Sequence, residues 1–315
     1  MYKILMIVNP KAGKGKITKY VEKIKDNLEE KKYSLEIEYT SLEKNATEIV
    51  KGYHSYFDIV LVWGGDGTLN EVIEGLVYLN KKAFVGFVPS GTTNDFARSL
   101  GAAFDMIHLS ENINLYDSKK IDMGKCNGKI FNYIISFGMF AKTSYKTNRF
   151  LKNKLGRVAY IFNAFGEIFF HKKYNLNIVI DSKEIKGKFV YGSISNSKYV
   201  GGFPLFKNKE IELDDGLFDI VLVKDVKNIF TKIKMLINVL SGNLKDPNIY
   251  YLKGKHIEIE IEETSNDWLE FTRDGEYGGK VKNLNIINLK QHNEYILPVG
   301  KNFEEELDDD LEDDD

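Results

Sequence analysis

The chain has 315 residues, of which 43% are hydrophobic and 29% charged, and its formal net charge is −2. Ten of the acidic residues lie in residues 304–315, so the rest of the chain carries 44 basic and 36 acidic residues, a balance of about +8. The sequence has no apolar run near the ~18 residues of a membrane-spanning helix. A single cysteine, Cys126, excludes an intramolecular disulfide framework and predicts a cytoplasmic location.

The first hundred residues alternate strand signals with helix signals. Strands are expected at Lys3–Val8, Ser34–Tyr39, Asp58–Trp63 and Ala83–Val88, with helices near Thr18–Lys31, Ala46–Tyr53 and Leu69–Leu79. Strands separated by helices of this length predict a parallel sheet with right-handed crossovers. Ligands bind such sheets beyond the carboxyl ends of the strands.

Three polar, glycine-containing loops lie at those strand ends. Residues 64–71 read GGDGTLNE, residues 9–16 read NPKAGKGK, and residues 89–98 read PSGTTNDFAR. Glycines before a helix N-terminus favour phosphate binding, whereas the carboxylate of Asp66 would repel phosphate. That carboxylate therefore indicates a divalent cation or a proton-donating partner. Taken alone, the lysine-rich loop is an ordinary basic turn, and Asn94 or Asp95 could simply cap a helix.

After about residue 120 the pattern becomes a series of short strands. They are expected at Lys129–Ser136, Leu176–Ile180, Phe189–Ser195, Phe218–Val223, His256–Ile261, Trp268–Thr272 and Leu284–Leu289. Helical insertions are expected at about 145–170 and 227–241. The first is aromatic and basic, which fits either a membrane-docking surface or a helix packed on the β-domain.

The three loops together resemble those of the bacterial diacylglycerol kinases and their relatives, the sphingosine and ceramide kinases. The resemblance continues at Ile121–Gly124, Leu213–Asp219 and Asp274–Tyr277. NAD kinases and 6-phosphofructokinases share the GGDGT loop, but the segment SGTTNDFAR favours the lipid kinases. By itself, Asp274-Gly275 is a hairpin-turn signal, and Asp214-Asp215-Gly216 also reads as a turn.

The resemblance implies an α/β fold joined to a β fold. We expect a doubly wound ATP-binding domain, like that of phosphofructokinase or NAD kinase, at residues 1–121, to which about 291–303 returns. We expect an antiparallel β-sandwich with helical insertions, which would bind the lipid substrate, at 122–290. The acidic segment 304–315 is expected to be a disordered tail.

The resemblance also implies roles for particular residues. Glu276 would be the general base, and Asp66, Asp95 and Asp122 would form an acidic network that organises Mg2+. The ATP site would be lined by Asn9, Pro10, Lys11, Ala12, Gly13, Thr40, Gly65, Asp66, Gly67, Thr68, Asn70 and Thr92. A structural Mg2+ would be bound by the Asp215 side chain and by the backbone carbonyls of Glu212 and Leu217. The segment Lys207–Glu210 departs from the family pattern just before this turn.

The expected activity is transfer of the ATP γ-phosphate to a lipid hydroxyl, with diacylglycerol as the acceptor and phosphatidic acid as the product. The alternatives are a kinase for a soluble acceptor such as NAD, or a catalytically silent nucleotide-binding regulator. The expected partners are ATP and a lipid at the membrane surface, without nucleic acid. Peripheral association with the inner face of the membrane is expected, and an exposed β-edge could pair two chains as a homodimer.

Overall fold

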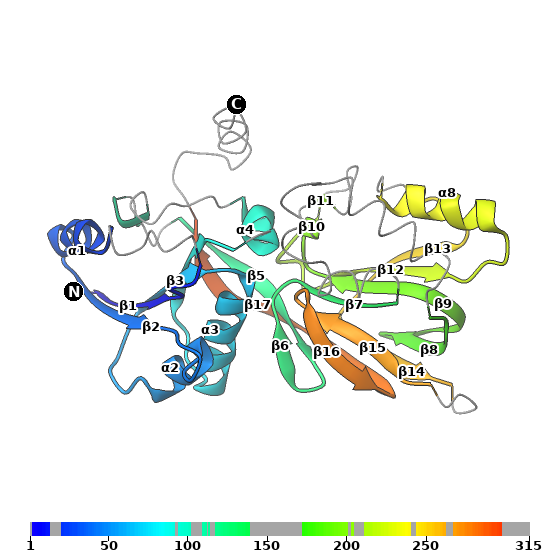
Figure 1. The fold of residues 1–315 in the computed structure, drawn as a ribbon, viewed down its shortest axis with the longest axis horizontal. Coiled ribbons are helices and arrows are strands. Elements are labelled where there is room, and N and C mark those ends of the chain that lie inside the picture. The colour runs from blue at the N-terminus through cyan, green and yellow to red at the C-terminus, as the bar shows by residue number, and fades with distance from the viewer. Residues whose placement is uncertain are drawn as a thin grey trace. The chain divides into compact units, whose positions relative to one another are not determined.

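The computed structural model describes residues 2–12, 20–91, 94–101, 109–111, 113, 117–138, 172–200, 203–204, 211–240, 244–262 and 267–297. It divides into two compact units (Figure 1). Unit 1 contains Met1–Ile121 and Gln291–Asp315, and unit 2 contains Asp122–Lys290. The chain passes from one unit to the other within two strands. Strand β5 (Ser118–Cys126) contains the boundary after Ile121, and strand β17 (Asn283–Ile296) contains the boundary after Lys290.

Unit 1 is built on a parallel sheet. Its strands are β1 (Tyr2–Val8), β2 (Tyr33–Tyr39), β3 (Ile59–Gly64), β4 (Phe84–Pro89) and the C-terminal end of β17. The order is β2-β1-β3-β4-β17, and every one of these neighbours is parallel. The chain goes from β1 to β2 on one side and then to β3 on the other side of β1. The order therefore reverses between β1 and β3, which is where open α/β sheets bind ligands.

Helices connect these strands. They are α1 (Val21–Glu30), α2 (Ala46–Gly52), α3 (Asp66–Tyr78) and α4 (Asp95–Leu100). Helix α1 buries Ile24 and Leu28, which lie one turn apart on the same face. Helix α2 begins after Asn45, whose side chain accepts a hydrogen bond from the Glu48 N–H at 3.0 Å. Strands β1 and β3 are almost continuously apolar and buried, as expected of strands covered on both faces.

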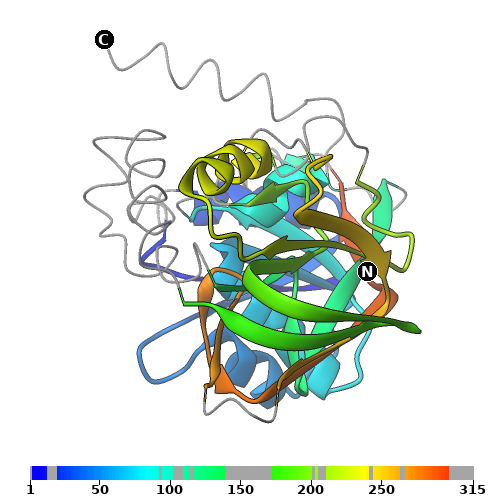
Figure 2. The same ribbon diagram turned by 90° about the vertical axis from the view of Figure 1, so that its right-hand side faces the viewer.

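Unit 2 is built from antiparallel strands. They include β6 (Lys129–Phe131), β7 (Ile134–Gly138), β8 (Tyr174–Ile180), β9 (Lys183–Ser195), β12 (Phe218–Lys224), β13 (Ile249–Gly254), β14 (His256–Ile261), β15 (Leu269–Arg273) and β16 (Glu276–Val281). The long strand β9 pairs with β7, β8 and β12. Figure 2 shows β8 and β9, in green, twisting together as one antiparallel ribbon. Apolar side chains such as Phe131, Phe137 and Phe218 fill the core between the strands.

Helix α8 (Ile229–Leu240) connects β12 to β13, where the sequence predicted a helical insertion at 227–241. The insertion expected at 145–170 and the acidic tail 304–315 lie outside the described residues. The predicted fold class, a doubly wound α/β domain joined to a β-rich domain, is confirmed.

Three differences from the predicted elements bear on the site. Helix α3 begins at Asp66, three residues before the predicted start, so Asp66 and Gly67 already belong to its first turn. The predicted strand Lys129–Ser136 is broken at Asn132–Tyr133 into β6 and β7. Strands β5, β13 and β16 were not predicted.

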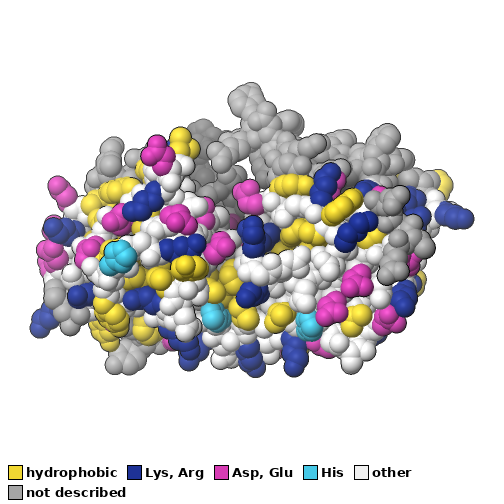
Figure 3. Space-filling model, turned by 90° about the horizontal axis from the view of Figure 1, so that it is seen from below, with side chains coloured by type: hydrophobic (Ala, Val, Ile, Leu, Met, Phe, Trp, Pro, Cys, Tyr) yellow, Lys and Arg dark blue, Asp and Glu magenta, His cyan; other side chains and the backbone are white. Residues whose placement is uncertain are grey.

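None of the helices within the described ranges has the length and apolarity needed to cross a bilayer. On the face shown in Figure 3, lysines and arginines alternate with acidic side chains and single apolar residues. The surplus of positive charge calculated from the sequence is therefore not gathered into one patch on that face.

Candidate functional site

The carboxyl ends of β1, β3 and β4 carry the three predicted loops, and backbone hydrogen bonds join them. The Asn9 N–H donates to the Trp63 carbonyl at 2.8 Å, and the Ser90 N–H donates to the Gly64 carbonyl at 2.9 Å. Thr40, at the end of β2, donates its N–H to the Val8 carbonyl at 2.9 Å. The structure thus brings Asn9, Thr40 and the loop after Gly64 to one edge of the sheet, at the switch point.

Asn9 links the first loop to helix α3. Its Nδ2 donates to Thr68 Oγ1 at 3.2 Å, and its Oδ1 accepts from the Lys11 N–H at 3.0 Å. The Ala12 N–H donates to the Asn9 carbonyl at 3.0 Å, which closes a turn around Pro10 and Lys11. The first loop and the helix therefore form one hydrogen-bonded group. Asn70 lies on the next turn of α3, and Gly13 and Thr92 lie outside the described residues.

Different features of the structure explain the glycines of residues 64–71 and Gly91 of the loop after β4. A Cβ on Gly64 would come within 2.5 Å of Thr68 Cβ. Gly65 and Gly91 have their backbones in contact, because a Cβ on Gly91 would come within 2.8 Å of the Gly65 Cα. A Cβ on Gly67, in contrast, would meet nothing within 4 Å. Packing explains the first three glycines, and only Gly67 leaves open space over the first turn of α3.

Asp66 connects two helix N-termini. Its own helix, α3, begins at this residue, and its carboxylate accepts N–H groups of α4 from Asp95 at 3.1 Å and Phe96 at 3.3 Å. These are N–H groups that an α-helix cannot satisfy internally. Asn94 does not cap α4 with its side chain; it has a left-handed backbone, φ +48°, and binds Gly91 on both its amide atoms. The Asp66 carboxylate therefore contacts the backbone of Asp95, and the sharing of a Mg2+ by the two carboxylates stays a prediction.

The loop edge fits an anionic ligand that carries a cation. Ser90 Oγ is shielded from solvent and has no hydrogen-bond partner in the part of the chain that the structure describes. The open space at Gly67 lies over N–H groups that favour phosphate, and the Asp66 carboxylate belongs to the same first turn of α3. Asp66, with the 2% exposed Asp95, could therefore hold a nucleotide-bound Mg2+, which would neutralise phosphate charge.

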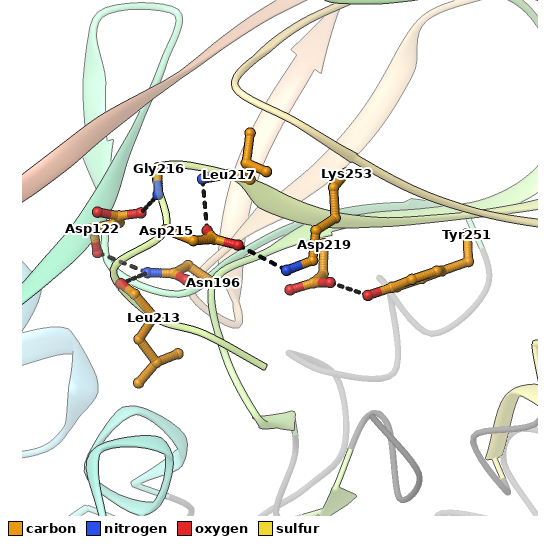
Figure 4. A network of polar contacts seen from close by, with 9 residues as sticks. All are labelled: Asp122, Asn196, Leu213, Asp215, Gly216, Leu217, Asp219, Tyr251 and Lys253. Carbon is orange, nitrogen blue, oxygen red and sulfur yellow. Dashed lines mark hydrogen bonds and ion pairs between the residues drawn. The ribbon is translucent and has the colours of Figure 1, made fainter. Parts of the chain in front are cut away.

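Asp122 lies in unit 2 and organises a turn there (Figure 4). Its Oδ2 accepts from the Gly216 N–H at 2.6 Å, and its own N–H donates to the Leu213 carbonyl at 2.8 Å. Asn196 Nδ2 donates to the carbonyls of Asp122 at 2.9 Å and Leu213 at 3.1 Å. With an exposure of 1%, Asp122 holds the turn at 213–216 against β5. Its membership of the Asp66–Asp95 network stays a prediction.

The Asp215 carboxylate, the predicted side-chain ligand of a structural Mg2+, has two protein partners. Its Oδ2 pairs with Lys253 Nζ at 2.8 Å, and its Oδ1 accepts from the Leu217 N–H at 2.9 Å (Figure 4). The Mg2+ site, with the backbone carbonyls of Glu212 and Leu217 as its other ligands, stays a prediction. The ammonium group of Lys253 supplies the positive charge at this turn.

Lys253 faces several acidic groups. Burial by itself lowers the pKa of Lys253, but its hydrogen bond to Asp215 and the charges of Asp219 and Glu212 raise it overall. Asp219 is 1% exposed and accepts a hydrogen bond from the Tyr251 hydroxyl, and burial together with this carboxylate raises the pKa of Tyr251. Lys253 and Tyr251 both come from β13. Lys253 neutralises the charge of Asp215 in the turn before β12, and Tyr251 donates a hydrogen bond to Asp219 of β12.

Glu276 is the first residue of β16, and its side chain is exposed. It follows a two-residue turn in which Asp274 and Gly275 both have positive φ, +47° and +77°, as a type I′ hairpin requires. The buried Asp274 carboxylate accepts three N–H groups, from Asn132 at 2.8 Å, Tyr133 at 3.0 Å and Ile134 at 3.1 Å. These three hydrogen bonds lie where the strand is interrupted at Asn132 and Tyr133, and they order the backbone turn that precedes Glu276.

The sequence did not single out Ser90 or Lys253, and it did not reveal the contacts of Asp274. Ser90 lies inside the recognised PSGTTNDFAR segment, so its position in that segment could have identified it as a candidate ligand-binding residue. Lys253 is one lysine among many, and nothing in its neighbourhood of the sequence indicates Asp215. Asp274 reads as a turn residue, and its three backbone donors lie at least 140 positions earlier.

Comparisons with known proteins agree with these observations. Residues 3–126 match the diacylglycerol kinase catalytic domain, and residues 133–288 match the YegS C-terminal NAD kinase beta sandwich-like domain. A diacylglycerol kinase of Bacillus subtilis is 29% identical over 98% of this chain and 100% of its own length. One from Staphylococcus haemolyticus is 30% identical over 97% of this chain and 91% of its own.

Solved structures extend the likeness to the fold. The crystal structure of a diacylglycerol kinase from Bacillus anthracis aligns with a TM-score of 0.74 and 29% identity, covering 94% of this chain and 97% of that one. A second structure from the same organism aligns with a TM-score of 0.76 and 30% identity, covering 94% of this chain and 95% of that one.

Proposed function

Because this chain belongs to the diacylglycerol kinase family, we propose that it transfers the γ-phosphate of ATP to a lipid hydroxyl, with diacylglycerol as the acceptor. The observation that carries the proposal is the loop edge of unit 1. Open space at Gly67, the carboxylate of Asp66 and the Ser90 hydroxyl, which has no hydrogen-bond partner among the described residues, occur together there. These three features suit a nucleoside triphosphate that binds together with a cation.

Unit 1 would hold the nucleotide. The N–H groups at the start of α3 would face the phosphates, and the Asn9–Thr68 hydrogen bond would fix the first loop beside them. Mg2+, held by Asp66 and Asp95, would supply charge neutralisation of the phosphates. Thr40 and Asn70 would contact the nucleotide from the end of β2 and the second turn of α3.

Unit 2 would supply the base. The acceptor hydroxyl oxygen would form a bond to the γ-phosphorus as the bond from that phosphorus to the β,γ-bridging oxygen breaks. Glu276 would take the hydroxyl proton, and ADP would leave with the bridging oxygen. The type I′ turn and the three N–H bonds of Asp274 order the backbone directly before Glu276, which supports this role.

Replacing Glu276 with Gln tests this assignment. Glutamine keeps the shape of the side chain but cannot take a proton, so kcat should fall by about 10²–10⁴ while the affinity for ATP is unchanged. Phosphatidic acid formation and nucleotide binding are measured separately. The control is Glu260→Gln, the same change at an exposed position of β14, which should keep wild-type turnover.

Turnover by Glu276→Gln at the wild-type rate would remove Glu276 from the chemistry. Loss of nucleotide binding in that variant would instead show that the residue acts on the nucleotide, which also contradicts the assignment.

A further inference from the structure

The C-terminal end of β17 directs the chain toward the loop edge of unit 1, the edge of the parallel sheet at which the three loops lie. This end of β17 runs parallel to β4, with Tyr295 beside Val85. The carboxyl ends of parallel strands lie at one edge of a sheet, so the chain beyond β17 heads for that edge. Val85 lies four residues before Pro89, the end of β4, which is about 13 Å along the strand.

The side chains at this end of β17 pack beside the candidate site. The rings of Tyr295 and of Phe96 in α4 lie 5.1 Å apart between centroids, and both residues are buried. The Phe96 N–H is one of the two that the Asp66 carboxylate accepts, at 3.3 Å. The Leu297 N–H donates to the Asp117 carbonyl at 2.7 Å, which fixes the end of the described chain. A single aromatic contact therefore links this end of the chain to the helix that Asp66 caps.

The sequence beyond Leu297 is strongly acidic and long enough to reach the loop edge. Residues 304–315, the acidic segment, contain ten acidic and no basic side chains. The chain from Leu297 to Glu304 spans up to about 24 Å when it is extended, and the acidic segment itself adds up to about 40 Å. Both lengths exceed the ~13 Å that separate the level of Tyr295 from the end of β4.

The loop edge offers positive charge to such a segment. Lys11 is exposed in the turn that the Asn9 carbonyl closes, and residues 1–21 contain five lysines and no acidic residue. The start of α3, with its open space at Gly67, adds the partial positive charge of a helix N-terminus. The Asp66 carboxylate repels an anion less than a fully solvated one would, because it accepts two N–H groups of α4.

We propose that the acidic segment binds the loop edge at Lys11 and the start of α3, where it competes with the phosphates of ATP. This inference rests on the proposed function, because it gives the proposed nucleotide site a competitor within the same chain. Both partners belong to unit 1, and the covalent connection gives the segment an effective concentration on the order of millimolar. A weak electrostatic contact is then enough to raise the apparent KM for ATP, and nucleotide binding releases the segment.

Steady-state kinetics of full-length variants test the competition. Replacing the six aspartates at 308–310 and 313–315 with asparagine should lower the KM for ATP by about three- to tenfold and leave kcat unchanged, because only a competitor of the free enzyme is removed. The matched control replaces the same six residues with glutamate, which keeps the charge and should keep the wild-type KM. Added salt should reduce the difference between the wild type and the asparagine variant, because it screens the contact.

Energy transfer within the full-length chain measures the contact without turnover. Trp63, at the carboxyl end of β3, is the donor, and Trp268→Phe removes the other tryptophan. Leu311→Cys carries the acceptor dye, and the native Cys126 is 3% exposed, which protects it from labelling. Transfer should be high at low salt and should fall when salt, or ATP with Mg2+, is added.

Two results would overturn the proposal directly: transfer that salt does not change, or a wild-type KM in the asparagine variant. Transfer that responds to salt but not to saturating ATP, in a chain that binds ATP by equilibrium dialysis, would place the segment elsewhere and would also overturn it. A chain that binds no ATP would contradict the proposed function. In that chain, loss of transfer in Lys11→Glu would still support the contact at the loop edge, and unchanged transfer in Lys11→Glu would overturn it.

Discussion

At Gly67, helix stability favours alanine, whereas close approach of a phosphate to the backbone favours glycine. It lies in the first turn of α3, where alanine would be the better helix former, and no neighbour stands where its Cβ would be. Nothing in the packing of the described residues requires glycine there. The reason we infer is close approach of a phosphate to the backbone.

Gly67→Ala should therefore stabilise the protein by about 0.5–1 kcal/mol while raising the KM for ATP at least severalfold. Urea unfolding and steady-state kinetics measure the two effects. Gly52→Ala is the matched control, since Gly52 ends α2 and also has open space around its Cβ. It should add similar stability and leave the KM unchanged. An unaltered KM in Gly67→Ala would count against a phosphate at this position.

Lys253 places a positive charge beside Asp215, at the turn where a structural Mg2+ is predicted. Because it neutralises Asp215 at 2.8 Å, we expect the melting temperature of the wild type to be the same in excess EDTA and in Mg2+. Lys253→Met should lower the free energy of unfolding by about 1–2 kcal/mol, a value reduced from that of a fully buried pair because the groups are partly exposed. Lys186→Met, which removes an exposed pair with Glu184, should leave the free energy of unfolding close to that of the wild type.

Thermal unfolding with and without chelator decides the point. A wild-type melting temperature that falls when EDTA is added would show that the turn needs a metal after all.

Among the elements, the β15–β16 hairpin shows how a distant contact positions a functional residue. Burial raises the pKa of Asp274 to about 6 from its ordinary 3.8, although the three backbone N–H groups oppose this by favouring the carboxylate. The folded state therefore binds the proton more tightly than the unfolded state. The contribution of this group to stability is full below about pH 4 and is lost as the pH rises through about 6.

Asp274→Asn removes that titration. The wild type should lose stability relative to the variant between about pH 4 and 6.5, by up to about 3 kcal/mol over the whole range. Urea midpoints measured at half-unit pH steps give both curves. Parallel curves would mean that Asp274 keeps an ordinary pKa when folded, and the explanation from burial would fail.

The elements that could be predicted are those with a local signal. Apolar runs marked β1, β3 and β4, and the alternation of strands and helices placed their loops at one sheet edge. Strand β16 could not be predicted, because its sequence EYGGKV lacks alternation and becomes a strand only by pairing with β15. The start of α3 was placed too late because the glycines around Asp66 suggested a loop.

The site was predictable as a set of loops and much less as a set of contacts. Asp66 meets the backbone of a residue 29 positions away, Lys253 pairs across 38, and Asp274 reaches across 142. No local pattern encodes these partners, since they depend on which strands become neighbours. The family resemblance gave roles to Asp66 and Glu276 without showing that Asp66 also caps α4.

At the scale of the whole molecule, each unit presents one part of the proposed reaction. Unit 1 would bind the phosphates at the switch point of its parallel sheet, and unit 2 would supply Glu276, which follows the ordered turn at Asp274.

The most direct measurement of the central claim is the fate of the label from ATP labelled at its γ-phosphate. The chain is incubated in parallel with diacylglycerol in mixed micelles, with ceramide in the same micelles, and with NAD in solution. We predict that label enters the lipid fraction as phosphatidic acid when diacylglycerol is the acceptor, and that Glu276→Gln slows this transfer by about 10²–10⁴. Label appearing on NAD, with none in any lipid, would contradict the account.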